Sequence, residues 1–332
     1  MTNADQAAEA APTTSASRTN AAASKTVLIV NAAKADTGAA AELHERVARA
    51  FAETGQPKPR MMMTTPDDGG IEVARAAVES GADLVVACGG DGTVNAVAQA
   101  LCGTDVALGV LPLGTGNLLA GQLGIPSALD DAIAALLHGS GRRIDLGVVD
   151  GRVFVGMAGL GLDAAMIADA SERLKARVGW PAYVPSILRH LRDRGERVTL
   201  RVDGRRVRHR RVKALIVGNH GRLHGGIDLM PDAAPDDGVL DVVVLEPYGR
   251  LSGWLEVLLR LLIRRDGPHI SRYRVRQVEA RVRHAVPLEL DGDPYRVANV
   301  LSVQVKPGAL LVRTPEPQQR SSDSLREVGA RP

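Results

Sequence analysis

The sequence predicts an α/β protein, with an N-terminal three-layer α/β/α domain followed by a mainly antiparallel β-sandwich domain with inserted helices. Two observations support this prediction. Apolar strands alternate with amphipathic helices over residues 25–144, which is typical of a parallel sheet covered on both faces. Over residues 145–314, short strands of alternating polarity and turn sequences replace that rhythm, as expected for an antiparallel sandwich.

The first domain begins with an uninterrupted apolar stretch, "TVLIVN", at residues 26–31, which predicts a buried strand. Residues 39–54 then place apolar side chains at a period near 3.6, as an amphipathic helix does. The same alternation continues along the domain. It predicts strands at residues 59–65, 83–89 and 106–112, and helices at residues 69–80, 93–102 and after residue 117.

The second domain is predicted from turn sequences between short alternating runs. The pairs Asp150-Gly151 and Asp203-Gly204 each lie between two such runs, which is a strong signal for a two-residue β-hairpin. Three helices are expected to interrupt the strands. They lie at about residues 162–177, 181–193 and 249–265.

Composition narrows the class of protein. Phe, Trp and Tyr make up only 2% of the chain, so aliphatic side chains must form the cores. Cys88 and Cys102 are too few for a disulfide framework and lack metal-ligand spacing, which indicates a reducing, cytoplasmic compartment. No apolar run approaches the roughly 18 residues of a transmembrane helix.

The chain has few aromatic residues and no recognition motif, which argues against nucleic-acid binding. The polar tails at residues 1–24 and 315–332 are expected to be disordered.

A glycine-rich turn follows the third predicted strand. Gly89, Gly90 and Gly92 surround Asp91, and Thr93 opens the next helix. Glycines there let backbone N–H groups approach a ligand, and a helix N-terminus favours an anion. A carboxylate beside phosphates makes sense where it holds Mg²⁺, accepts a hydroxyl proton or bonds a ribose. The alternative is an ordinary tight turn between a strand and a helix.

The fourth predicted strand ends in a second turn of this kind, Gly114-Thr115-Gly116-Asn117. Turns after successive parallel strands lie at the same edge of the sheet, where the ligands of open α/β sheets bind. Thr115 and Asn117 offer a hydroxyl and an amide to phosphate or ribose, and the alternative role for each is a helix N-cap. Together the two turns predict a nucleotide-binding domain.

The two turns also resemble a known family. "GGDGTVN" at residues 89–95 and "PLGTGN" at residues 112–117 resemble the diacylglycerol kinase catalytic-domain family, which includes bacterial soluble lipid kinases and the sphingosine and ceramide kinases. "GGDGT" alone would also fit NAD kinases, but the whole set of blocks in this order is specific. The other similar blocks lie at residues 179–191, 217–245 and 288–294, so the resemblance covers roughly residues 25–313.

The resemblance implies that ATP binds in a cleft between the two domains and that its γ-phosphoryl group passes to a lipid hydroxyl. The implied cofactors are ATP and Mg²⁺. The implied nucleotide site consists of Asn31, Thr65, Gly89, Gly90, Asp91, Gly92, Thr93, Asn95, Gly114, Thr115 and Asn117.

The family's late Asp-Gly-Glu, whose acidic residues are the candidate bases, corresponds here to Asp291-Gly292-Asp293. Asp293 takes the place of the glutamate and is the first candidate for the general base, followed by Asp291, with Asp91 as a rival. The shorter side chain of Asp293 departs from the family, and so does Leu118, where many members carry aspartate. Asp91, Asp291 and Asp293 would therefore hold the catalytic Mg²⁺.

The resemblance further implies a structural Mg²⁺ in the second domain. Its ligands would be the side chain of Asp237 and the carbonyls of Ala234 and Val239, since Mg²⁺ prefers oxygen ligands and keeps some of its waters. Spacing alone favours a plain turn at residues 235–238.

Residues 250–276 combine an apolar helix, Trp254 and six arginines from Arg260 onward. This composition is typical of an interfacial anchor on anionic lipid, and equally of a core helix followed by a basic strand. His220 and His224 lie in a predicted loop and are expected to be polar groups near the acceptor pocket at most, rather than a zinc pair.

The predicted function is that of an ATP- and Mg²⁺-dependent lipid kinase, peripherally associated with the membrane, that converts diacylglycerol to phosphatidic acid or phosphorylates a related lipid. One alternative is an NAD kinase-like enzyme with a soluble acceptor. The other is an inactive nucleotide- or lipid-binding module, for which Leu118 and Asp293 are the motivating departures. Members of the family often pair, so a homodimer stays open, and the sequence does not name the lipid.

Overall fold

The structure is a computed structural model. It describes residues 25–33, 37–65, 69–161, 195–221, 228–248, 251–263 and 267–316. The helices predicted at 162–177 and 181–193, the sequence block at 179–191, both terminal tails up to residue 24 and from residue 317, and His224 lie outside the described residues.

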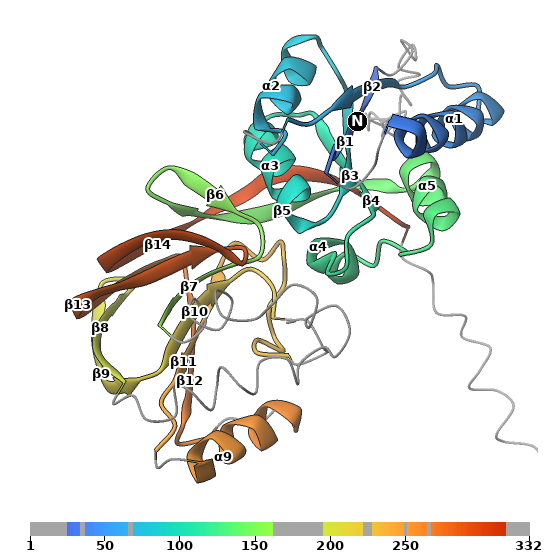
Figure 1. The fold of residues 1–332 in the computed structure, drawn as a ribbon. Coiled ribbons are helices and arrows are strands. Elements are labelled where there is room, and N and C mark those ends of the chain that lie inside the picture. Colours follow the sequence, from blue (N-terminus) through green and yellow to red (C-terminus); the bar gives the residue numbers. More distant parts are fainter. Residues whose placement is uncertain are drawn as a thin grey trace, which may run out of the picture.

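A parallel sheet forms the centre of the first domain. Its strands are β1 (Thr26–Val30), β2 (Arg60–Met63), β3 (Leu84–Gly89) and β4 (Ala107–Pro112), in the order β2-β1-β3-β4. The helices are α1 (Thr37–Glu53), α2 (Ile71–Glu79), α3 (Asp91–Leu101), α4 (Leu118–Gln122) and α5 (Leu129–His138). Helices α1 and α5 cover one face of the sheet and α2 and α3 the other (Figure 1). The predicted three-layer arrangement is confirmed.

Helix α5 is an element that the sequence-based prediction missed. Its buried side chains Ala132, Ile133 and Leu136 recur at helical spacing. Asp130 and Asp131 lie in its first turn, where the helix dipole favours negative charge. Both signals are present in the sequence "LDDAIAALLH" and would have located the helix.

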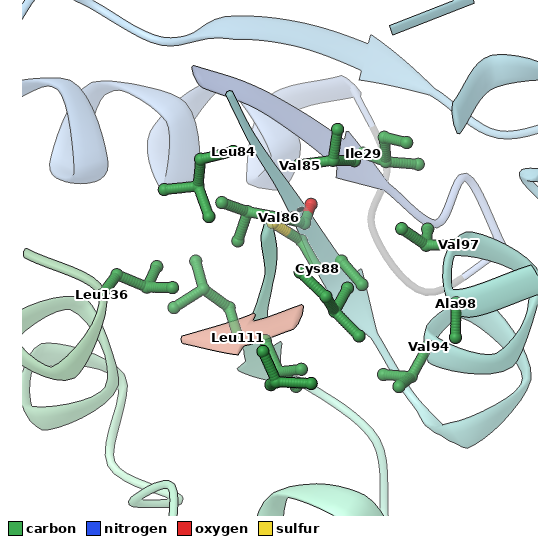
Figure 2. Packing of buried hydrophobic residues seen from close by; sticks show 14 of the residues in the cluster. Ile29, Leu84, Val85, Val86, Cys88, Val94, Val97, Ala98, Leu111 and Leu136 are labelled. Atoms are coloured by element: carbon green, nitrogen blue, oxygen red, sulfur yellow. Dashed lines mark hydrogen bonds between the residues drawn. The ribbon is translucent and has the colours of Figure 1, made fainter. Parts of the chain in front are cut away.

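The core of the first domain packs around β3, whose residues are all buried. Figure 2 shows Val94 and Val97 of α3 on one side of β3 and Leu136 of α5 on the other. Cys88 lies inside this core, where burial raises the pKa of its thiol to about 12. Cys88 and Cys102 are both free thiols, consistent with the absence of a disulfide framework.

Antiparallel strands form the second domain. They are β5 (Ser140–Val149), β6 (Arg152–Phe154), β7 (Met157–Gly161), β8 (Glu196–Val202), β9 (Arg205–Val212), β10 (Ala214–Gly218), β11 (Leu240–Leu245), β12 (Ile270–Val275), β13 (Gln277–Leu290) and β14 (Asp293–Thr314), with helix α9 (Leu251–Leu262) between β11 and β12. Both predicted hairpins are confirmed. Asp150-Gly151 joins β5 to β6 and Asp203-Gly204 joins β8 to β9, and all four residues have positive φ.

Strand β13 contributes to both layers of the sandwich. Its first half, residues 278–282, pairs with β8, and its second half, residues 288–290, pairs with β7. The pairing with β14 shifts register between Arg281 and Val286, as expected where a strand turns a corner between layers. The strands enclose a second aliphatic core that includes Leu200 and Val303.

Strand β14 joins the two domains, as the long red strand of Figure 1 shows. It pairs with β13 and β5 in the second domain, and its Val312 lies beside Leu108 of β4 in the first. The domain boundary predicted between residues 144 and 145 falls inside β5. A single sheet therefore runs through both domains and fixes Asp293, the first residue of β14, relative to the parallel strands.

Candidate active site

The two glycine-rich turns pack directly against each other. A Cβ on Gly114 would lie 2.5 Å from the Cα of Gly90, which is too close for any side chain. The N–H of Leu113 donates to the carbonyl of Gly89 at 2.9 Å. The side chain of Asn117 accepts from the N–H of Gly114 at 3.1 Å and donates to its carbonyl at 2.7 Å. Asn117 therefore maintains the shape of the second turn with the same side chain that was predicted to bind nucleotide.

Asn31 and Thr93 connect the first turn to the end of β1. The amide of Asn31 donates to the hydroxyl of Thr93 at 2.8 Å, and Thr93 is buried. A Cβ on Gly89 would lie 2.5 Å from that hydroxyl. The structure thus brings three of the predicted nucleotide-site residues together, and their contacts with one another hold the turn in place.

The remaining predicted nucleotide residues keep exposed surface at the same sheet edge. Thr65 and Thr115 are exposed after β2 and β4, and Asn95 is half-buried on α3. The neighbour of Thr65, Thr64, is buried and accepts from the N–H of Ala32 at 3.2 Å. Sequence reasoning missed Thr64, although its position directly after an apolar strand was the available signal.

Asp91 connects the first turn to α4. Its Oδ1 accepts from the backbone N–H of Leu118 at 2.7 Å, and its side chain is half-buried. The contact uses the backbone of residue 118, so it does not depend on which side chain stands there. The carboxylate of Asp91 keeps a defined position although Leu118 departs from the family pattern.

Asp291 and Gly292 form the tight turn between β13 and β14. Their φ angles are 52° and 88°, which are typical of a two-residue hairpin of type I′. The carboxylate folds back onto the start of β7. Oδ2 accepts from the N–H of Val155 at 2.9 Å, and Oδ1 accepts from those of Gly156 at 2.6 Å and Met157 at 2.9 Å. Asp291 is therefore both a turn residue and a fixed negative group.

The pKa of Asp291 depends on burial, on its hydrogen bonds and on the charge of Asp91. Burial raises the pKa of Asp291 to about 6, the three amide hydrogen bonds oppose that rise, and the negative charge of Asp91 adds to it. Like charges raise a carboxyl pKa in this way when they are near each other. The negative charge of a carboxylate in the first turn thus acts on a carboxylate in the β13–β14 turn, which belongs to the other domain.

Asp293 lies just beyond this turn. It is exposed and stands opposite Leu290 in the hairpin. The structure therefore separates the two acidic residues of the late motif, because Asp291 is anchored by amides while Asp293 faces the surface.

His220, two residues after the end of β10, borders the same site. A Cβ on Gly156 would lie 2.6 Å from His220 Nε2 and 2.8 Å from Asp291 Oδ1, so both side chains flank this glycine. His220 is buried, and burial lowers its pKa to about 4. The histidine expected in a loop near the acceptor pocket is thus a neutral buried group beside Asp291.

Asp91 and Asp291 fit a divalent cation, because a positive ion would relieve the repulsion between their charges. Within the described residues, no group of three His, Cys, Asp or Glu side chains is arranged to hold a metal ion. An ion at this site would need further ligands from water and phosphate, as Mg²⁺ commonly takes.

The second metal site, predicted at Asp237, Ala234 and Val239, fits less well. The carboxylate of Asp237 pairs with the guanidinium of Arg274 and accepts from the N–H of Val239 at 3.2 Å. Arginine therefore already supplies the positive charge that a metal would bring.

A buried aspartate that sequence reasoning missed shapes this turn instead. Asp145 is 2% exposed and accepts from the N–H of Gly238 at 2.6 Å and from that of Gly308 at 2.7 Å. A lone charge within the apolar run "IDLGVV" was the available signal.

No helix in the described part of the chain has both the length and the apolarity to cross a bilayer.

Two family descriptions match the chain. The diacylglycerol kinase catalytic domain matches residues 25–149, and the YegS C-terminal NAD kinase beta sandwich-like domain matches residues 156–314.

Curated relatives share both regions. A protein of Chromohalobacter salexigens named "Probable lipid kinase YegS-like" is 33% identical over 254 residues, which cover 74% of this chain and 81% of that protein. A Pseudomonas putida protein of the same name is 36% identical over 242 residues, covering 72% and 79%. A crystal structure of a diacylglycerol kinase from Bacillus anthracis str. Sterne has the same fold, with a TM-score of 0.68 at 19% identity over 88% of this chain and 97% of that one.

Proposed function

The chain belongs to the diacylglycerol kinase catalytic-domain family of lipid kinases, and we propose that it transfers the γ-phosphoryl group of ATP to the hydroxyl of diacylglycerol. The observation that supports this most directly is that the negative charge of Asp91 acts on Asp291, which belongs to the other domain. Phosphoryl transfer requires two bound partners to be positioned and their charge to be neutralised. A carboxylate pair between two domains suits that task.

The phosphates of ATP would bind at the glycine-rich turns. Helix α3 begins at Asp91, within the first glycine-rich turn, so its N-terminal amides and dipole favour an anion there. The contact of Gly90 with Gly114 and the hydrogen bond from Asn31 to Thr93 hold the turns in one shape. The preformed turns would lower the entropy cost of binding phosphate.

Mg²⁺ would be held by Asp91 and Asp291, and when bound it supplies positive charge against the phosphates. The three amide hydrogen bonds to Asp291 fix the direction of its carboxylate. The amide of Leu118 does the same for Asp91. These contacts position both carboxylates before any ligand arrives.

We assign the general base to Asp293. Both oxygens of Asp291 accept backbone hydrogen bonds, whereas Asp293 is exposed one step beyond the turn. In the reaction the lipid hydroxyl gives its proton to the carboxylate of Asp293 as its oxygen bonds the γ-phosphorus. The bond from that phosphorus to the β–γ bridging oxygen breaks, and ADP leaves with the electron pair.

Asp293→Asn tests the assignment, since asparagine keeps the shape and cannot take the proton. We expect turnover to fall by about 100-fold or more, with ATP affinity within twofold of the unchanged protein. Asp293→Glu, which restores the family's residue, is the matched control and should keep turnover. Normal turnover in Asp293→Asn would remove this residue from the mechanism.

The substrate class is tested by transfer from γ-labelled ATP, with Mg²⁺, to diacylglycerol and other lipids in mixed micelles, alongside NAD as a soluble acceptor. We expect label in a lipid, with diacylglycerol labelled fastest. Label in NAD alone would replace the lipid proposal with a soluble acceptor. ATP binding with no label in any acceptor would contradict an active kinase.

A further inference from the structure

Helix α9 lies at the end of the second domain that is remote from the parallel sheet (Figure 1), and three of its apolar side chains form an exposed stripe. Leu255 is 65% exposed, Leu259 56% and Ile263 52%. The three residues are four apart, and the N–H of Ile263 still donates to the carbonyl of Leu259 at 3.0 Å. They therefore lie along one face of the helix.

The opposite face of α9 already has a partner. Val257 and Leu261 are buried and pack in a small core with Leu245 and Ile270. The stripe is thus additional to the face that attaches the helix. Among the described residues, six large hydrophobic side chains are exposed, and four of them, Tyr248 and the stripe, fall within residues 248–263. Such clustering marks an interaction surface, whereas scattered exposed leucines do not.

Arginines at the end of β9 border this helix. The N–H groups of Arg210 and Arg211 donate to Oε1 of Glu246 at 3.1 Å and 3.3 Å. The guanidinium of Arg211 lies over the ring of Tyr248, 5.5 Å from its centroid. A Cβ on Gly253 of α9 would meet the backbone of Tyr248. Tyr248 therefore connects the arginines to the helix.

The carboxylates near the stripe already have partners. Glu246 is paired with His209 at 2.6 Å. Arg210 and Arg211 are exposed, and neither guanidinium pairs with a carboxylate in the part of the chain that the structure describes. Glu256, on α9 itself, is paired with Arg260 at 2.8 Å and with His269 at 3.1 Å. The negative group on the helix is thus neutralised, while the arginine rim is not.

We propose that the α9 surface, defined as Leu255, Leu259, Ile263, Tyr248 and the rim of Arg210 and Arg211, docks on an anionic phospholipid membrane. An apolar helical face with a cationic border lies in the interface, with its leucines among the acyl chains and its arginines at the headgroups. A second copy of the chain fits less well, because a symmetric pair would place one unpaired arginine rim near another. Docking would bring the proposed lipid kinase to its substrate, so this inference rests on the proposed function.

Vesicle sedimentation of the full chain without ATP tests the docking. The vesicles are phosphatidylcholine alone or phosphatidylcholine mixed with phosphatidylglycerol. We expect at least tenfold stronger binding to the anionic vesicles. Leu255→Glu with Leu259→Glu should weaken that binding about tenfold or more, and Arg210→Glu with Arg211→Glu should remove most of the preference for anionic lipid.

Matched controls separate the surface from general effects. Val297→Glu changes an equally exposed apolar residue on β14, 68% exposed. Arg276→Glu with Arg283→Glu changes charge by the same amount away from α9. Both controls should bind within twofold of the unchanged protein. Equal losses in the controls, or no binding to anionic vesicles by the unchanged protein, would overturn the proposal. So would a dimer that the stripe variant converts to monomer in size-exclusion chromatography with light scattering.

A second assay keeps docking and chemistry apart. A short-chain diacylglycerol dissolved as monomer needs no membrane, so the stripe variant should phosphorylate it at the normal rate, which also shows that the variant is folded. On vesicles its rate should fall in step with binding. Vesicle binding by a protein that phosphorylates no lipid would contradict the kinase function and leave docking supported. Phosphorylation of vesicle lipid that the stripe variant performs equally well would contradict docking alone.

Discussion

The turns Asp203-Gly204 and Asp291-Gly292 have the same sequence and the same backbone but different surroundings. The φ angles are 44° and 85° in the first and 52° and 88° in the second, and each turn closes a β-hairpin. Asp203 is exposed, and its carboxylate accepts from the N–H groups of Arg276 and Gln277. Asp291 accepts from three amides and lies near Asp91. The same dipeptide thus forms a plain turn in one place and part of a site in the other.

Substitution of both aspartates by asparagine is the strongest test of this comparison. Each change keeps a residue that tolerates positive φ and loses acceptors for backbone N–H groups, so each should cost about 1–2 kcal/mol of unfolding free energy. Asp291→Asn should also lower turnover by about 100-fold, because it removes the charge beside Asp91. Asp203→Asn should leave turnover within twofold. Equal turnover in the two variants would reduce Asp291 to a structural residue.

The pH dependence of stability distinguishes the turns next. The pKa of Asp291 is raised to about 6 from an ordinary 3.8, so between about pH 4 and 6 the folded protein keeps a proton that the unfolded chain has lost. Its contribution is therefore present below that window and is lost as pH rises through it, by about 2–3 kcal/mol.

Chemical denaturation of the two variants measures the loss as a difference, because burial also raises the pKa of Asp241 to about 6 and lowers that of His220 to about 4. Between about pH 4 and 6, Asp291→Asn should gain stability relative to Asp203→Asn as pH rises. Parallel curves for the two variants would assign the pH dependence to other groups.

A methyl group at Gly156 should lower turnover less than Asp291→Asn does. It disturbs the surroundings of Asp291 and leaves the Asp203 turn unchanged. The new Cβ would lie 2.6 Å from His220 Nε2 and 2.8 Å from Asp291 Oδ1, so both side chains must move. We expect Gly156→Ala to lower turnover about tenfold and the free energy of unfolding by about 1–2 kcal/mol. Gly121→Ala is the control, since its Cβ would meet nothing within 4 Å. Unchanged kinetics in Gly156→Ala would show that the position of Asp291 is not critical.

The smallest effect is expected at Asp237, which serves no site that we assign. Because Arg274 pairs with its carboxylate, chelation of divalent ions should leave the Tm of the unchanged protein within about 1 °C, and Arg274→Met should cost about 0–1 kcal/mol. Arg281→Met, which breaks another exposed pair, with Glu279, is the matched control. A clear fall in Tm on chelation would support the structural metal instead.

Much of the molecule was predictable from the sequence because local preferences decide it. The spacing of apolar residues located most strands and helices and so predicted the three-layer domain. The Asp-Gly pairs located two hairpins. The glycine-rich turns and their family resemblance were visible in the same way. In each case the deciding residues are neighbours in the chain, and their backbone preferences act within one element.

The family resemblance singled out Asp291, but only the tertiary structure decided what surrounds its carboxylate. The partners of Asp291 at residues 155–157 are 134 to 136 positions away in sequence, and no local preference identifies them. The tertiary structure also buries Thr64 while it leaves the adjacent Thr65 exposed. It buries His220 beside Asp291, which lowers the pKa of that histidine and keeps it neutral. A dipeptide determines a backbone conformation, but the solvation and charge around its side chain come from the elements packed against it.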